Sequence, residues 1–391
     1  MYQFEAERSP RSAGINYFLA ASVFLLTGLG LVTLYSSSYA FASRFYDNGL
    51  YFMTGQLWAG GIGIVLFFAA SRVDLEILRK LIKPLVIFAV ILCVLTFVPG
   101  IGDARNGASR WIKLPGGKTF QPSELVKFVL PLYLAHIFDK KRDRLDEFSA
   151  AILPPVLVTA LFFIIIYLQN NFSTAVFIAG NALFIFFLAG VKLRYFFSAI
   201  VMLLPLSGLL ILTREHRLRR LISFIKPEWE PHGAGYQVGA SIRTIVQGGF
   251  WGKGLGQGTR KIASVPEVHS DFIFCSFAEE AGFLGVILFF VLFGVFACLG
   301  YRGAARTTMY RKLLAYGLLT MILSQAMLNI AVVSGSLPTT GLPLPFFSAA
   351  GSSLAITLLM AGLIVNICRD GPEYQLQDLP YAGIRGGAHV R

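Results

Sequence analysis

The sequence predicts an all-α integral membrane protein with about ten transmembrane helices and a large extracytoplasmic loop between the seventh and the eighth. Two observations about composition predict this class. Hydrophobic residues make up 55% of the 391 residues and charged residues only 14%, whereas about 25% charge is usual in a soluble domain. The apolar residues also gather in runs of about 20, the length that crosses the hydrocarbon core of a bilayer. A chain this poor in charge must expose much of its surface to lipid.

Each apolar run is predicted to form one span of a single membrane domain over residues 1–391. The first run has full spanning length and lacks a small-residue cleavage pattern, so we expect it to be a span and not a signal peptide. The fourth is the least regular, because it is short and carries charge. The ten predicted spans are 15–36, 51–71, 80–98, 123–138, 151–168, 172–190, 194–213, 272–300, 310–334 and 350–368.

The charges of the short loops predict the orientation. Loops 71–80, 139–149, 191–194 and 301–312 are basic, whereas the alternate loops 37–50 and 169–171 hold only Arg44 between them. Cytoplasmic loops carry the excess of Lys and Arg. We therefore expect both termini in the cytoplasm, with 369–391 as a cytoplasmic tail. The net charge of +13 then indicates contact with anionic headgroups and no nucleic-acid partner.

Three longer stretches, 99–122, 214–271 and 335–349, all fall on the opposite, outer face in this topology. Long stretches without obvious structure are usually functional, so we expect the functional site on that face. The last of them is rich in proline and glycine, which predicts a rigid, re-entrant connection. Irregular backbone at membrane depth is tolerated where it lines a cavity or is buried in protein.

The large loop 214–271 begins with a basic amphipathic segment, Arg214–Arg220, of the kind that lies in the membrane interface. A positive surface there suits an anionic lipid-linked substrate such as a pyrophosphate, and simple headgroup binding explains it equally well. The glycine-rich segment 248–258 could bring backbone N–H groups close to a phosphate. It is not a P-loop, because no strand precedes it and no Walker lysine follows.

Asp271 stands at the mouth of the eighth predicted span. A carboxylate at a water–lipid boundary is well placed to act as a general base, because partial burial raises a carboxyl pKa towards the useful range. The pattern alone favours a plainer interpretation, in which Ser270 or Asp271 caps the helix that follows. Both interpretations stay open at this point.

Polar residues also occur inside the predicted spans. Glu124 and Lys127 are three residues apart after Pro122, so they share a helix face and can pair. Such a pair at the entry of a membrane helix is a functional candidate, and a structural ion pair between helices is the alternative. Deeper in the spans, Glu279 and Glu280 are expected to face the bundle interior as supporting groups, and Gln325 and Asn329 to form interhelical hydrogen bonds.

Ordered motifs along nearly the whole chain resemble those of the SEDS family of peptidoglycan glycosyltransferases (FtsW, RodA and SpoVE), with a slight lean towards FtsW. These motifs are NGASRWI (106–112), FQPSELVK (120–127), GYQ (235–237), GKGLG (252–256), PEVHSDF (266–272), LPTTGLPLP (337–345) and GSS (351–353).

The resemblance implies an enzyme of the bacterial cytoplasmic (inner) membrane that polymerises lipid II on the outer face during cell division or elongation. It implies a class B penicillin-binding protein as partner, together with other divisome or elongasome membrane proteins. No organic cofactor is expected, and a divalent cation (Mg²⁺ or Mn²⁺) held by Asp271 is an alternative that stays open. The rival interpretations are a lipid II flippase and a structural scaffold.

Site residues follow from the matched positions. The family's essential aspartate falls on Asp271, and its glutamate and lysine after the Gln-Pro pair fall on Glu124 and Lys127, which we predict to be catalytic. The predicted substrate-binding residues are Arg110, Arg243, Lys253, Glu267, His269 and Ser352. The chain departs from the family pattern at 348–352 and at the turn 169–174. We assign no role to the turn 169–174.

Overall fold

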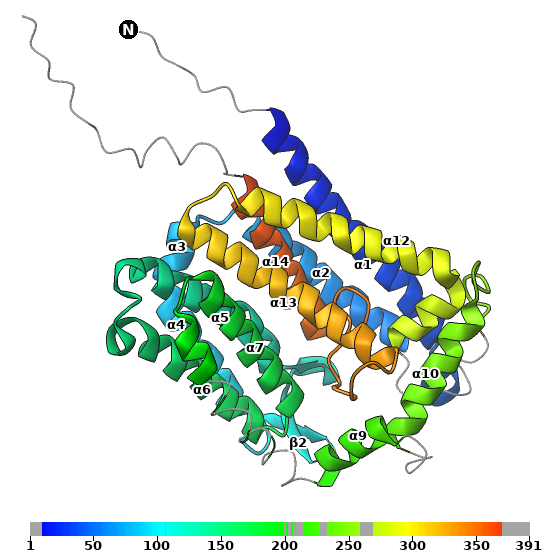
Figure 1. Cartoon of the computed structure of the whole chain (residues 1–391). Helices are drawn as coiled ribbons and strands as arrows, with labels where there is room; N and C mark the ends of the chain where they lie inside the picture. The colour runs from blue at the N-terminus through cyan, green and yellow to red at the C-terminus, as the bar shows by residue number, and fades with distance from the viewer. Residues whose placement is uncertain are drawn as a thin grey trace, which may run out of the picture.

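The computed structural model describes residues 10–105, 107–198, 201, 205, 208, 215–226, 233–258 and 269–369. Long helices lie side by side in a bundle (Figure 1). The helices before the large loop are α1 (Pro10–Tyr46), α2 (Tyr51–Ala70), α3 (Leu75–Lys80), α4 (Ile82–Leu95), α5 (Pro122–Lys140), α6 (Leu153–Leu168) and α7 (Phe172–Leu188). The helices within and after it are α9 (Glu215–Ile225), α10 (Ala234–Gly248), α12 (Ile273–Ala304), α13 (Met309–Val333) and α14 (Gly351–Arg369).

The described helices support a multi-pass membrane protein. Within the described residues, six helices are long and apolar enough to cross a membrane: α1, α2, α12, α13, α14 and the segment Phe148–Leu168 that contains α6. The helices α4 and α7 are apolar and shorter. Nine of the ten predicted spans coincide with described helices, and the predicted span 194–213 lies mostly outside the described residues. The same is true of the predicted tail, of which only Arg369 is described.

The predicted short loop 37–50 is wrong over most of its length, because α1 continues to Tyr46. In the structure, Ser37, Ser38 and Ala42 are buried against the bundle, and the Ser37 hydroxyl donates to the carbonyl of Leu34. Small side chains at this point let α1 pack closely and do not end the helix.

The segment 99–122 is folded, which corrects the all-α prediction locally. It forms an antiparallel sheet in the order β1 (Gly102–Arg105), β2 (Ala108–Lys113) and β3 (Thr119–Phe120). Glycines make its turns possible: Gly107 has φ 73°, and Gly116 and Gly117 between β2 and β3 have φ 77° and 71°, conformations that cost other residues energy. The sheet brings Arg110 to the end of the bundle that also carries α9 and α10 (Figure 1).

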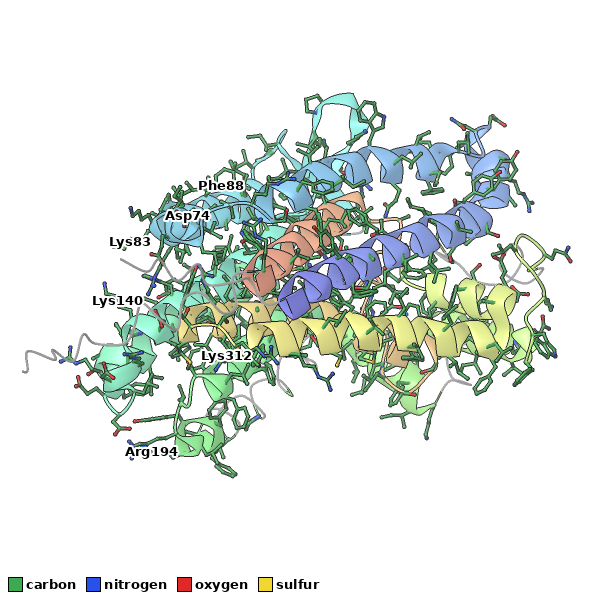
Figure 2. All side chains as sticks on the ribbon, turned by 90° about the horizontal axis from the view of Figure 1, so that it is seen from above. Asp74, Lys83, Phe88, Lys140, Arg194 and Lys312 are labelled. Carbon is green, nitrogen blue, oxygen red and sulfur yellow. The ribbon has the colours of Figure 1, made fainter. Side chains whose placement is uncertain are left out.

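Basic residues from three of the predicted cytoplasmic loops lie at the other end of the bundle. Figure 2 shows Lys140, Arg194 and Lys312 there, together with Lys83 of α4 and the acidic Asp74. Residues from separate parts of the sequence thus share this end of the molecule.

The contact between α2 and α14 depends on glycine. At Gly362 a Cβ would lie 2.3 Å from the carbonyl oxygen of Phe67, and at Gly63 it would lie 2.6 Å from the side chain of Leu358. The amide of Asn366, one turn after Gly362, donates to the carbonyls of Ala70 and Val73 at 2.8 and 2.7 Å. Small residues let two membrane helices approach closely, and here the close approach also allows α14 to bind the carbonyls at the end of α2.

We therefore expect Gly362→Ala to lower the free energy of unfolding by about 1–3 kcal/mol, the usual cost of overpacking. Thermal unfolding of the purified protein in detergent checks this. Gly294→Ala is the matched control, because a Cβ at Gly294 of α12 would meet nothing within 4 Å and alanine is the better helix former. Equal unfolding temperatures for the two variants would show that the α2–α14 contact does not require a glycine at 362.

Candidate functional site

Asp271 lies immediately before α12 and is held by its backbone. Its carbonyl oxygen accepts a hydrogen bond from the Asn329 amide of α13 at 2.8 Å, and its Oδ1 accepts one from the Ser270 hydroxyl at 3.1 Å. A Cβ built at Gly341 would lie 3.4 Å from its Oδ2. The helix starts at Ile273, and Phe272 at the cap position makes no side-chain cap. The interpretation of Ser270 or Asp271 as a helix cap is therefore wrong.

Two arginines interact electrostatically with Asp271 from other segments, Arg110 on β2 and Arg220 on α9. Burial and, to a lesser degree, the charge of Arg220 lower the pKa of Arg110 to about 10, whereas the charge of Asp271 acts in the opposite direction. Burial likewise lowers the pKa of Arg220, and again Asp271 opposes the effect. The two guanidinium groups remain charged at neutral pH, so the site combines one carboxylate with two cations.

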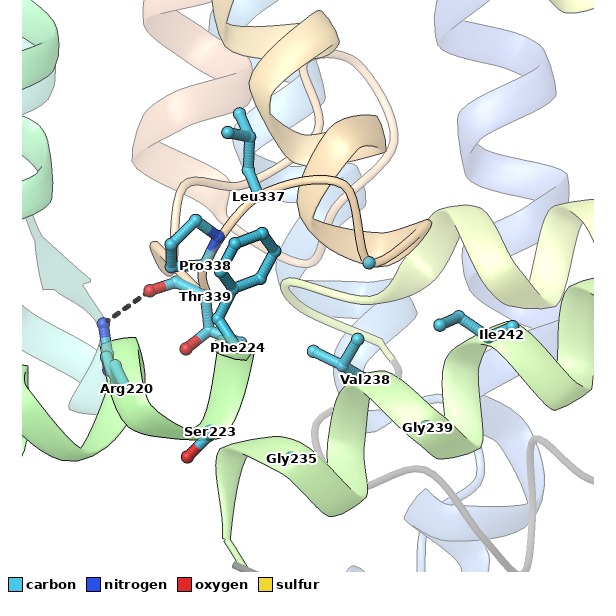
Figure 3. Close-up of a pocket in the computed structure, with 11 residues that line it drawn as sticks. Arg220, Ser223, Phe224, Gly235, Val238, Gly239, Ile242, Leu337, Pro338 and Thr339 are labelled. Atoms are coloured by element: carbon cyan, nitrogen blue, oxygen red, sulfur yellow. Dashed lines mark hydrogen bonds between the residues drawn. The ribbon is translucent and has the colours of Figure 1, made fainter. Parts of the chain in front are cut away.

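Each arginine is fixed by a backbone carbonyl. The Nη2 of Arg110 donates to the carbonyl of Asn170, and the Nη1 of Arg220 donates to the carbonyl of Thr339 at 3.2 Å (Figure 3). The Nε of Arg110 and the hydroxyl of Thr339 are buried and have no hydrogen-bond partner among the described residues. Buried polar groups normally have partners, so these two are candidates to bind a ligand.

Arg220 escaped prediction as a single residue, since the sequence showed only a basic run around it. The position of α9 distinguishes Arg220 from the other basic residues. Arg217 of the same helix donates from Nη1 to the Tyr167 hydroxyl at 3.1 Å and lies over the ring of Phe172. These contacts hold α9 against α6 and α7.

An apolar recess opens beside Arg220. Its walls are Phe224 of α9, Val238 and Ile242 of α10, and Leu337 and Pro338 of the loop between α13 and α14 (Figure 3). Figure 3 shows Arg220 at one side of the recess with its bond to Thr339. A cation next to an apolar recess suits a ligand that has an anionic part and a hydrocarbon part.

Glu124 and Lys127 form a buried ion pair on α5, as their spacing predicted. Lys127 Nζ lies 2.7 Å from Glu124 Oε1, and the side chains are only 1% and 4% exposed. The ammonium also donates to Gln325 Oε1 of α13 at 2.7 Å, and the Gln325 amide donates to the carbonyl of Pro343 at 2.8 Å. The ion pair is therefore connected through Gln325 to the loop between α13 and α14.

The interhelical hydrogen bond predicted for Gln325 is confirmed by its bond to Lys127 of α5, whereas Asn329 bonds to carbonyls outside the helices. One turn after Gln325, Asn329 donates to the carbonyls of both Asp271 and Leu342 at 2.8 Å. A continuous set of hydrogen bonds along α13 thus connects the ion pair of α5, the α13–α14 loop and the backbone of Asp271.

Other predicted site residues lie in different surroundings. His269 is buried beside Phe52 and Phe41, with ring centroids 4.0 and 5.2 Å away, and its carbonyl accepts from the Ala349 N–H at 2.9 Å. Burial lowers the pKa of His269 to about 4, so the imidazole is neutral at pH 7 and adds no positive charge. Ser352 is half-buried in the first turn of α14.

Lys253 and Arg243 contact other parts of the protein. Lys253 Nζ lies 3.5 Å from Glu279 Oε1 of α12 and 3.0 Å from Gln247 Oε1. Arg243 is exposed on α10, with its guanidinium alongside Gly239. Glu267 lies outside the described residues.

The glycine-rich segment binds the protein itself. The N–H groups of Lys253 and Gly254 donate to the carbonyls of Glu279 and Glu280 at 3.0 and 3.1 Å. A Cβ at Gly252 would lie 2.2 Å from the carbonyl oxygen of Glu280, so glycine is needed for this close contact with α12. The interpretation of these N–H groups as a phosphate cradle is wrong for this part of the segment, because they already have acceptors.

The divergent turn 169–171 has a structural role that its sequence did not reveal. The Gln169 amide donates to the carbonyl of Cys93 at 3.0 Å, and the Asn170 amide donates to the carbonyl of Gly107 at 2.7 Å. Asn170 adopts φ 59° and also supplies the carbonyl that binds Arg110. The turn therefore positions the sheet and one of the two arginines.

The described donors around Asp271 do not by themselves form a site for a divalent cation. The described residues contain no group of three His, Cys, Asp or Glu able to hold a metal ion. Arg110 and Arg220 interact with Asp271 and repel a cation, whereas Mg²⁺ needs oxygen ligands. We derive no step through a metal.

Comparisons with known proteins agree on one family. The family model described as "Cell cycle protein", for FtsW, RodA and SpoVE, matches residues 17–371. The probable peptidoglycan glycosyltransferase FtsW of Geobacter sp. (strain M18) is 36% identical over 91% of this chain and 97% of its own length. Stage V sporulation protein E of Bacillus subtilis (strain 168) is 34% identical over 90% of this chain and 97% of its own.

Solved structures share the fold. A chain of a peptidoglycan synthase complex, solved to explain how polymerization and crosslinking are coordinated, superposes with a TM-score of 0.75 at 26% identity, covering 91% of this chain and 98% of its own. The rod shape determining protein RodA of Thermus thermophilus superposes with a TM-score of 0.66 at 26% identity, covering 91% and 97%.

The buried ion pair yields a prediction on stability. Lys127→Met leaves the Glu124 carboxylate buried without its cation, which costs about 3–5 kcal/mol when a buried pair is broken. We expect a correspondingly large fall in the unfolding temperature of the purified protein. The double variant Glu124→Gln, Lys127→Met removes both charges and should recover part of the loss. A single variant as stable as the unmodified protein would show that Glu124 does not depend on Lys127 for its charge balance.

Proposed function

The chain belongs to the family of FtsW, RodA and SpoVE cell cycle proteins, and from this premise we propose that it is a peptidoglycan glycosyltransferase that polymerises lipid II into glycan strands. The observation that carries the proposal is the electrostatic interaction of one carboxylate, Asp271, with two half-buried arginines, of which Arg220 lies beside an apolar recess. Lipid II has matching parts: a sugar hydroxyl to deprotonate, a pyrophosphate and a polyprenyl chain.

In this reaction Asp271 removes the proton from the acceptor sugar hydroxyl. The oxygen then attacks the anomeric carbon of the donor sugar with inversion, a new glycosidic C–O bond forms, and the bond to the lipid pyrophosphate breaks. Negative charge grows on the departing phosphate, so fixed cations in a site shielded from water stabilise the transition state. Arg110 and Arg220 are the cations that interact with this carboxylate, and the Nε of Arg110 has hydrogen-bonding capacity left for a phosphate oxygen.

Glu124 and Lys127 support the site from behind in this proposal. Their charges are buried and mutually satisfied, so we assign them to holding Gln325 and the α13–α14 loop in place, and not to the reacting atoms. His269, neutral and packed against aromatic rings, supports the loop through its backbone.

The proposed setting is the bacterial cytoplasmic membrane, with both termini in the cytoplasm and Asp271 on the outer face. The gathering of basic residues at the opposite end (Figure 2) supports this orientation. The likeness to a chain from a complex of polymerization and crosslinking supports a class B penicillin-binding protein as partner. The FtsW relatives support a role in division.

The test is polymer formation from purified lipid II by the full chain together with a class B penicillin-binding protein, with the products separated by size on a gel. We expect Asp271→Ala to make no polymer. Asp103→Ala is the control, because Asp103 pairs with Arg105 within the sheet and should leave polymer formation unchanged. Normal polymer from Asp271→Ala would rule out this site, whereas lipid II movement between liposome leaflets without polymer would indicate a flippase.

A second experiment tests the cations. Arg220→Gln should lower kcat by about 10²-fold, the usual effect of removing a group that stabilises transition-state charge. Arg219→Gln is the matched control on the same helix, because Arg219 is 61% exposed and pairs with Glu215. If both variants polymerise lipid II at the same rate, Arg220 does not act on the leaving group.

A further inference from the structure

A second polar junction lies where α12 is interrupted. Gly282 adopts φ 65° and ψ −168°, which no helix contains. In an unbroken α-helix the N–H groups of Phe283 and Leu284 would donate to the carbonyls of Glu279 and Glu280. The break removes both bonds and leaves four backbone groups to satisfy inside the protein.

The glycine-rich segment satisfies all four. The carbonyls of Gly249 and Phe250 accept from the N–H groups of Phe283 and Leu284 at 2.9 and 3.3 Å. In return, the N–H groups of Lys253 and Gly254 donate to the carbonyls of Glu279 and Glu280 at 3.0 and 3.1 Å. The inserted segment thus replaces the two missing helix bonds from outside the helix.

Side chains bind the same junction. Glu279 is fully buried, and its Oε1 lies 3.5 Å from Nζ of Lys253, which is 32% exposed. The Ser36 hydroxyl of α1 donates to Oε1 of Glu280 at 2.5 Å and accepts from the N–H of Gly256 at 3.1 Å. The glycine-rich segment, α1 and the first part of α12 are therefore joined by charge as well as by backbone.

The helical segment 273–281 has Asp271 just before its start and this junction at its end. A break in a helix weakens the coupling between the parts on either side, and here the N–H groups of Phe283 and Leu284 bond outside the helix. At the Asp271 end, Asn329 holds the backbone. At the other end, the orientation of the segment depends on the bonds to the glycine-rich segment.

We propose that Lys253 and Glu279 are positioning residues whose ion pair sets the orientation of segment 273–281, and thereby the position of Asp271 relative to Arg110 and Arg220. This inference rests on the proposed function. It gives Lys253 a role in holding a helix, in place of the substrate contact that the sequence suggested. The pair is 3.5 Å apart and one partner is fully buried, so loss of either charge leaves the junction unbalanced.

The test uses Lys253→Gln, Glu279→Gln, the double variant and Lys253→Arg in the lipid II polymerisation assay. We expect each Gln variant to lower kcat by about 10- to 100-fold, the effect of misplacing a reacting group by about 1 Å, with KM within twofold of the original. The double variant should be no slower than the slower single variant, because the two residues act as one pair. Lys253→Arg should recover most of the rate.

Lys192→Gln is the control, because Lys192 forms an exposed ion pair with Asp146 in a loop of the opposite end. It should leave kcat unchanged. If folded Lys253→Gln and Glu279→Gln proteins keep the original kcat, the proposal fails. It also fails if Lys253→Gln raises KM at constant kcat, since Lys253 then contacts substrate. If Glu279→Gln does not insert into the membrane, the test relies on Lys253→Gln, because position 253 is partly exposed.

Hydrogen exchange provides a readout without catalysis. In lipid nanodiscs, the amides of 273–281 should exchange faster in Lys253→Gln than in the unmodified chain, while those of α13 stay unchanged. If the unmodified chain makes no polymer, the proposed function is wrong, and hydrogen exchange can still test the positioning role. If the two proteins exchange equally, only the positioning role is wrong.

Discussion

The structure depends on one constraint: irregular backbone inside an apolar helix bundle must find hydrogen-bond partners within the protein. Buried amide side chains meet this requirement repeatedly. Asn366 binds two carbonyls at the end of α2, Gln56 binds the carbonyl of Ser348, and Asn329 binds those of Asp271 and Leu342. At the break in α12 the glycine-rich segment does the same with its own backbone. These hydrogen bonds hold each irregular stretch in a fixed position.

The candidate site follows from this arrangement. Asp271 stands outside a helix, on backbone that Asn329 fixes from α13, so its carboxylate can face groups from distant segments. Arg110 lies on strand β2 and Arg220 on helix α9, and each is held by a carbonyl of yet another segment. The buried pair of Glu124 and Lys127 costs solvation energy and contributes order, because it fixes Gln325 and, through it, the α13–α14 loop.

Much of the fold was predictable because membrane helices are long, apolar runs with charged loops between them. The pairing of Glu124 with Lys127 and the bonding role of Gln325 and Asn329 were also predictable, since helical spacing places them on defined faces. The sheet of 99–122 was not, because its strands are short and its turns depend on glycine conformations. The extension of α1 to Tyr46 was also missed, because the predicted span ended with the apolar run at residue 36, whereas the bundle buries Ser37, Ser38 and Ala42 beyond it.

The sequence by itself determined the membrane class and the order of the motifs, and it pointed to Asp271 as the candidate carboxylate, because hydropathy and motif order are properties of the chain. Only the tertiary structure decided which cations meet that carboxylate. Arg110, Arg220, Arg243 and Lys253 look alike in a list of basic residues, yet two interact electrostatically with Asp271 and one pairs with Glu279. Electrostatic interactions fall with distance and depend on burial, and both are set by how segments far apart in sequence pack together.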